Sequence, residues 1–306
     1  MLGRTLLQAA PPTTLGLKAA GWLGAVRRCR RRLNAGFDES CALQFGGASG
    51  TLASLGKDGP AVSQALAAEL KLRLPEAPWH TQRDRLAALV CACAVLTGAL
   101  GKMARDISLL MQSEVQEAAE PESEGRGGSS TLPHKRNPIA CALTLAAAQR
   151  VPGLVAGFLS AMVQEQERAV GGWQAEWPVL AGVVQSAGLA VASMAEVAKG
   201  LSVNEARMRQ NMEETQGAIF AERAMMLLGP YLGRDVAHTL LEEAVRKSVA
   251  EKKHLADVLA EMPKVTADVS KKLLQQFETP EEYLGSAEEF RRRLLSSEAD
   301  TDEKER

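Results

Sequence analysis

The sequence predicts an all-α protein, in which a bundle of long helices is followed by a smaller helical domain. Apolar residues recur at steps of mostly three and four over long stretches, which is the spacing of one helix face. No run of alternating β-branched residues is present, and aromatic residues make up only 4% of the chain. Hydrophobic residues account for 46% of the 306 residues, which is enough for a sizeable core.

The longest helical pattern covers residues 83–116. A helix of about 30 residues is about 45 Å long at 1.5 Å per residue, so the helices that pack against it must also be long. The chain offers three such segments, residues 14–33, 137–164 and 178–199.

After Leu201 the helical segments become shorter and more highly charged. They cover residues 203–214, 218–228, 235–247 and 255–261, and a polar tail follows Leu295. We therefore expect a bundle domain over residues 1–200 and a C-terminal helical domain over residues 201–306.

Two stretches, residues 139–163 and 179–198, are long and apolar. The first contains Gln149, Arg150 and Pro152, and the second contains Gln185. A membrane span needs about 20 mostly apolar residues without such interruptions. Both stretches are therefore interpreted as buried bundle helices, and no membrane partner is expected.

Charge and cysteine content exclude further classes. The 36 basic and 37 acidic residues give a net charge of −1, which argues against a nucleic-acid partner. The basic run at residues 27–32 is interpreted as a solvated helix end. The five cysteines are an odd number and form no CxxC pair, which indicates a reducing, cytoplasmic location without a zinc site.

The segment from Glu117 to Arg136 is the strongest candidate for chemistry. It is first acidic, then rich in glycine, and it ends in Lys135 and Arg136. A structureless loop of this length in a helical domain is uncommon and usually functional. The following Asn137 and Pro138 suit the first positions of a helix, whose free N–H groups would attract a carboxylate. The alternative is a flexible surface linker with solvated cations.

The amino-acid sequence of this loop resembles the motif of a known protein family. GSSTLPHKRNP, from Gly128 to Pro138, resembles the GSSxMPxKxNP motif of the fumarase/aspartase superfamily, with only Leu132 departing from it. GRTLLQAAPPTTLGLKAAGW, which starts at Gly3, resembles the second conserved segment of that superfamily. PWHTQRDRL, WQAEW and EYLGSA are most similar to its carboxymuconate cycloisomerase family.

The resemblance implies a fold and a reaction. The fold would be a homotetramer whose long helices form a central bundle, with each active site built from three subunits. The reaction would be the closure of 3-carboxy-cis,cis-muconate to γ-carboxymuconolactone in the protocatechuate/β-ketoadipate degradation of aromatic compounds. The substrate is a small polycarboxylate, and the resemblance implies no metal and no organic cofactor.

The resemblance also implies roles for individual residues. Ser129 would handle the proton next to a carboxylate, and Lys135 and Asn137 would stabilise the charged intermediate. The implied substrate-binding residues are Thr5, Gln8, Ser130, His80, Arg83 and Arg136.

Two departures from the superfamily bear on the substrate. Adenylosuccinate-cleaving members carry a histidine after the threonine of the second segment, where this chain has Leu6. They also carry a serine and an arginine that hold a phosphate, where this chain has Trp173 and Trp177. Indole rings remove that phosphate site, so adenylosuccinate is disfavoured. The general acid stays open, with His80 and His134 as candidates.

Superfamily subunits are about half as long again and carry a domain before the second segment. We therefore expect this chain to correspond to a member without its first domain. Two alternatives stay open: another superfamily lyase that releases fumarate, of the adenylosuccinate or argininosuccinate type, and a truncated, non-catalytic helical oligomer.

Overall fold

The computed structural model describes residues 1–121, 127–128, 131–132, 135–270, 273–274, 277 and 279–296. The chain forms two compact units. We call residues 22–112 and 118–202 the bundle unit, and residues 1–21, 113–117 and 203–306 the terminal unit. The domain division at Gly200 stays a prediction, because compactness alone does not show that a part folds independently.

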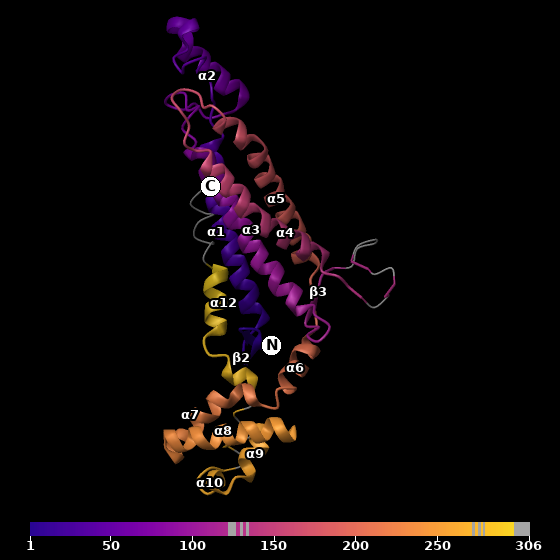
Figure 1. Ribbon diagram of the computed structural model, residues 1–306. Coiled ribbons are helices and arrows are strands. Elements are labelled where there is room, and N and C mark those ends of the chain that lie inside the picture. The colour runs from indigo at the N-terminus through magenta and orange to yellow at the C-terminus, as the bar shows by residue number, and fades with distance from the viewer. Residues whose placement is uncertain are drawn as a thin grey trace. The chain divides into compact units, whose positions relative to one another are not determined.

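Three long helices dominate the bundle unit, as Figure 1 shows: α3 (Asp84–Leu110), α4 (Ile139–Ser160) and α5 (Gly172–Gly200). Each of the three packs against the other two. The other helical elements of this region are α1 (Leu15–Ser40), which begins in the terminal unit, η1 (Ala53–Asp58) and α2 (Gly59–Leu70). The predicted all-α fold class is confirmed.

The bundle core forms where the apolar faces of α3, α4 and α5 meet. Val90, Val151, Phe158 and Val183 are completely buried there. Close approach of α3 and α4 depends on Gly101, because a Cβ atom at that position would lie 2.7 Å from the Cβ of Ala148. The helices therefore pack backbone to backbone at this point.

These helices also leave apolar surface uncovered. By length and composition, α3, α4 and α5 are each apolar enough to cross a membrane, yet only a third of the most apolar window of α4 and of α5 is buried. Trp177, Val184 and Val191 recur every seven residues along α5 and are 52%, 47% and 44% exposed. We call this stripe the outer seam.

The terminal unit combines a hairpin with short helices. Its elements are β1 (Leu2–Thr5), β2 (Gln8–Pro12), α6 (Glu205–Glu213), η2 (Ala218–Phe220), α7 (Ala221–Leu232), α8 (Arg234–Glu251), α9 (Leu255–Glu261), α10 (Pro263–Thr266), η3 (Pro280–Tyr283) and α12 (Ala287–Ser296). Leu228, Leu255, Leu259 and Phe277 are fully buried in its core. Two further short strands, β3 (Ala118–Ala119) and β4 (Ser202–Val203), pair with each other.

The β1–β2 hairpin is a short exception to the all-α fold, in a segment that shows no run of alternating β-branched residues. Thr5 pairs with Gln8, and Leu6 and Leu7 form the two-residue turn with φ of 50° and 65°. Such turns normally use asparagine and glycine, because both central residues need positive φ. With leucines in the turn and prolines in β2, the segment lacks the usual hairpin pattern.

Candidate active site

The loop that carries the GSSTLPHKRNP motif is closed by backbone hydrogen bonds at a point that we call the loop neck. The backbone N–H of Asn137 donates to the carbonyl oxygen of Gly127 at 2.8 Å, and that of Lys135 donates to Leu132 at 2.9 Å. Gly127 has φ of 78°, and a Cβ atom there would lie 3.1 Å from the carbonyl oxygen of Asn137. Glycine is therefore needed at the neck. The predicted residues Ser129, Ser130 and His134 lie outside the described residues.

The N-terminus of α4 differs from its prediction. The helix begins at Ile139, and Pro138 rather than Asn137 is the flanking residue, with no side-chain cap. The carboxylate of Glu120 accepts hydrogen bonds from the backbone N–H groups of Ala140 at 3.0 Å and Cys141 at 2.7 Å. These two N–H groups are therefore already bonded within the chain, so the expectation that this helix end offers free donors to a substrate carboxylate is wrong.

Glu120 contacts one residue of the motif, Arg136, and one residue that follows it, Cys141. The guanidinium of Arg136 donates to the carbonyl oxygen of Glu120 at 2.7 Å. Burial, together with a hydrogen bond to the Glu120 carboxylate, raises the pKa of the Cys141 thiol to about 12. Cys141 is thus a neutral donor rather than a nucleophile. Sequence reasoning missed Glu120, because a glutamate in an acidic run does not reveal which N–H groups it bonds.

Thr5 and Gln8 flank the turn of the hairpin in the terminal unit. The turn residues Leu6 and Leu7 are 97% and 75% exposed, although both are large and apolar. The hairpin is held by Arg4, whose guanidinium donates twice to the fully buried carboxylate of Glu117, at 2.7 and 2.9 Å. Thr5 and Gln8 therefore project from an anchored element.

Arg83 is committed to a partner within the chain. Its guanidinium donates twice to the Glu176 carboxylate, and both residues are buried. It also lies over the ring of Trp79, 5.4 Å from the centroid. This pair fixes the start of α5 against the segment that precedes α3. The substrate contact expected of Arg83 stays a prediction.

His80 packs against the indole ring of Trp173, near the start of α5. Its ring centroid is 4.8 Å from that of Trp173, which contacts Trp177 edge to face at 4.9 Å. Burial, and then the positive charges of Arg168 and Arg83, lower the pKa of His80 below its ordinary value. Its buried Nε2 has no hydrogen-bond partner among the described residues. His80 is therefore a neutral imidazole with one unused polar atom.

A cavity of about 240 Å³ adjoins His80. The glycine-rich stretch from Gly46 to Gly50 forms part of its wall, and Arg168 holds this stretch by donating to the carbonyl oxygens of Gly47 and Ala48 at 2.7 and 3.2 Å. The size suits a small polar molecule.

The predicted residues of the bundle unit fall into two separate groups. Lys135, Arg136 and Asn137 precede the start of α4, whereas His80 packs near the start of α5, which follows the far end of α4. Because α4 has 22 residues, these groups lie about 30 Å apart. One chain does not bring them together.

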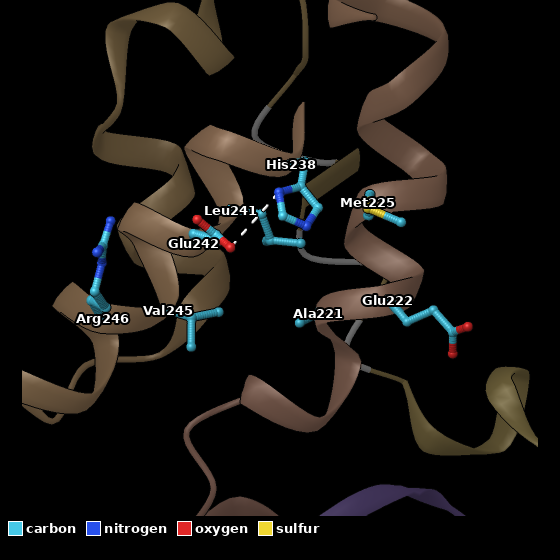
Figure 2. Close-up of a pocket in the computed structure, with 8 residues that line it drawn as sticks. All are labelled: Ala221, Glu222, Met225, His238, Leu241, Glu242, Val245 and Arg246. Carbon is cyan, nitrogen blue, oxygen red and sulfur yellow. Dashed lines mark ion pairs between the residues drawn. The ribbon is translucent and has the colours of Figure 1, made fainter. Parts of the chain in front are cut away.

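A second cavity lies in the terminal unit, outside these groups of residues. A pocket of about 520 Å³ forms an open groove between α7 and α8, where His238 and Glu242 pair with each other (Figure 2). It contains none of the predicted site residues. The described part of the chain holds no group of three metal-binding side chains.

Comparison with known proteins shows the protein family to which the chain belongs. A family model described as lyase matches residues 1–153, and one described as adenylosuccinate lyase C-terminus matches residues 217–294. The chain therefore belongs to the lyase family of the fumarase/aspartase superfamily.

Among individual proteins, the chain is similar to cycloisomerases of bacteria. The chain is 48% identical over 297 residues to a 3-carboxy-cis,cis-muconate cycloisomerase of Bradyrhizobium diazoefficiens, with 97% of the chain and 66% of the relative covered. The structure of the 3-carboxy-cis,cis-muconate lactonizing enzyme from Pseudomonas putida superposes with a TM-score of 0.88 at 47% identity, over 97% of this chain and 66% of that one. A class II fumarase from Schistosoma mansoni, at 18% identity and a TM-score of 0.71, shares the fold over 93% of this chain and 61% of its own. The chain thus spans about two thirds of the length of these cycloisomerases.

Proposed function

We propose that the chain acts as a 3-carboxy-cis,cis-muconate cycloisomerase, an intramolecular lyase of aromatic degradation. The observation that carries this proposal is the 48% identity to a curated cycloisomerase over 97% of the chain. The presence of Trp173 and Trp177, where purine lyases hold a phosphate, supports it against an adenylosuccinate-type reaction.

The proposed reaction joins two parts of one substrate. A carboxylate oxygen forms a bond to a carbon of an activated double bond, and the electron pair of that double bond moves onto a neighbouring carboxylate. The resulting aci-carboxylate carries its charge on two oxygens and then accepts a proton at carbon. The chemistry requires no metal and no organic cofactor.

Lys135 and Asn137 suit the charged intermediate. The ammonium group of Lys135 and the side-chain amide of Asn137 can converge on a developing oxyanion. There they would stabilise the transition state more than the substrate. Lys135 is exposed, and its backbone is held at the loop neck, so its charge is available to a ligand. Ser129, the proposed proton-handling residue, would need the same cation nearby, because a serine hydroxyl is a weak base.

We propose a homotetramer as the active form. The predicted residues of the bundle unit lie about 30 Å apart in one chain, so a complete site requires residues from more than one copy. The outer seam on α5 supports the same arrangement, because a heptad stripe of exposed apolar residues is typical of helices that pack against partner helices. A soluble, cytoplasmic enzyme without nucleic-acid or membrane partners fits this proposal.

The test is the loss of the ultraviolet absorbance of the conjugated diene when the chain meets 3-carboxy-cis,cis-muconate. Ser129→Ala is expected to abolish this loss at unchanged thermal stability. Ser160→Ala, which removes an exposed hydroxyl on α4, serves as the matched control and is expected to keep full activity.

Each alternative predicts a different result. Release of fumarate from a succinyl-amine substrate, with no decay of the diene, would favour another superfamily lyase. A folded chain that consumes neither substrate would favour a non-catalytic oligomer. Full activity of Ser129→Ala would contradict the role of that serine.

A further inference from the structure

Glu120 is a buried carboxylate that occupies the N-terminus of α4. It is 7% exposed, and each carboxylate oxygen accepts one backbone N–H, from Ala140 at 3.0 Å and from Cys141 at 2.7 Å. A negative charge is favoured at this end of a helix, where the N–H groups have no partner within the helix. The interaction therefore fixes the first turn of α4 to the strand segment that precedes the loop.

The backbone of Glu120 holds the motif itself. Its carbonyl oxygen accepts a hydrogen bond from the guanidinium of Arg136 at 2.7 Å. The adjacent Asn137 is tied on its other side to Gly127 at 2.8 Å. Lys135, Arg136 and Asn137 thus form a short segment held between Gly127 and Glu120.

We propose that Glu120 is a positioning residue, which orients Lys135 and Asn137 for the reaction through the backbone of the first turn of α4. The kinetic part of this inference rests on the proposed function. Charged and hydrogen-bonding groups act on a transition state only when they are placed to within a fraction of an ångström, and a 1 Å displacement costs about 100-fold in rate. Removing the carboxylate frees two N–H groups and lets the segment shift.

The decisive variant is Glu120→Ala, tested with small molecules that replace the lost group. We expect kcat on 3-carboxy-cis,cis-muconate to fall about 100-fold. Formate restores a carboxylate between the two N–H groups and is expected to recover much of the lost rate. Formamide has a similar size but no charge and is expected to recover little.

The matched control is Thr144→Val. Thr144 is fully buried one turn further along α4, and its hydroxyl donates to the carbonyl oxygen of Ala140 at 2.9 Å. This variant removes a buried hydrogen bond from the same helix and leaves the Glu120 contacts in place. Its kcat is expected to stay at the wild-type value.

Hydrogen exchange of residues 135–145 separates this inference from the proposed function. Exchange is expected to be faster in Glu120→Ala than in the wild type and slower again when formate is added, whether or not substrate turns over. A wild-type chain that does not consume the diene therefore counts against the proposed function only, while unchanged exchange in Glu120→Ala overturns the positioning role.

Three kinetic results would also overturn the inference. They are a normal kcat in Glu120→Ala, equal recovery with formate and formamide, and an equal loss of kcat in Thr144→Val. If Glu120→Ala fails to fold, Glu120→Gln replaces it, because the amide keeps the shape but turns an NH₂ group toward a backbone N–H. A folded Glu120→Gln variant is expected to lose kcat, and a normal kcat in it contradicts the proposal.

Discussion

Arg83 and Glu176 form a buried ion pair between residues that lie 93 positions apart in the chain. The motif at residues 78–86 indicates that Arg83 matters, and the fold adds which residue it binds. Glu120 is a similar case, since its hydrogen bonds to Ala140 and Cys141 depend on the return of the chain after the loop. A sequence motif predicts which residues are important, whereas the fold determines which partners those residues contact.

His80 gives the stability of the chain a specific pH dependence. Its pKa in the folded chain is below the ordinary value of 6.5, because burial and two nearby arginines disfavour the charged form. Between the lowered pKa and 6.5 the unfolded chain binds more protons, so stability rises with pH through this window. We expect the urea midpoint to fall as the pH drops below about 6.5.

The matched measurement uses His80→Gln, which cannot take up this proton. Its urea midpoint is expected to depend less on pH between 5 and 7 than that of the wild type, at a fixed protein concentration. Thr81→Val, which removes a neighbouring hydroxyl but no ionisable group, is the control and is expected to show the pH dependence of the wild type. Equal pH dependence in His80→Gln and the wild type would contradict the assignment.

The helices were the most predictable elements. Apolar spacing predicted α9 with its observed ends, and it predicted α3 and α8 to within a few residues at most ends. Termini that depend on tertiary contacts were predicted less well. α3 ends at Leu110 rather than at residue 116, and α1 extends seven residues beyond the predicted Leu33. The β1–β2 hairpin was missed, because its turn consists of two leucines and the ion pair of Arg4 with Glu117 that holds it is a long-range contact.

The contact between α3 and α4 at Gly101 predicts that alanine substitutions at two glycines of α3 change the stability in opposite directions. Gly101→Ala places a methyl group 2.7 Å from Ala148 and is expected to lower the free energy of unfolding by about 1–3 kcal/mol. Gly98→Ala meets no atom within 4 Å and is expected to raise it by about 0.5–1 kcal/mol, because it reduces the freedom of the unfolded chain. Chemical denaturation of both variants tests this, and equal effects would show that the helices do not approach closely here.

At the scale of the whole molecule, the outer seam is apolar surface that the single chain leaves exposed. The three residues of the seam stand about two turns apart on one face of α5, where their exposure would be costly for a lone chain. Composition alone cannot distinguish such a face from one that contacts lipid, since α3, α4 and α5 all satisfy the length and hydropathy of a membrane span. In the proposed homotetramer, this face would be covered by helices of neighbouring copies.

The seam predicts that a single charge disrupts assembly. Val184→Glu places a carboxylate on the seam and is expected to shift the native mass from tetramer toward smaller species at micromolar concentration. Gln185→Glu adds the same charge at the neighbouring exposed position outside the seam and is expected to leave the mass unchanged. A tetramer that survives Val184→Glu would show that the seam is not an interface.

The roughly 30 Å between the two groups of predicted residues also has a genetic consequence. In the proposed assembly, a chain with a defective motif loop still contributes an intact His80 region to its neighbours, and a chain with a defective His80 region still contributes an intact loop. Two alleles that are each inactive alone would therefore restore a fraction of complete sites when both are expressed in one cell. In the proposed assembly, whether a cell has enzyme activity would therefore depend on which two alleles it carries, and not on either allele alone.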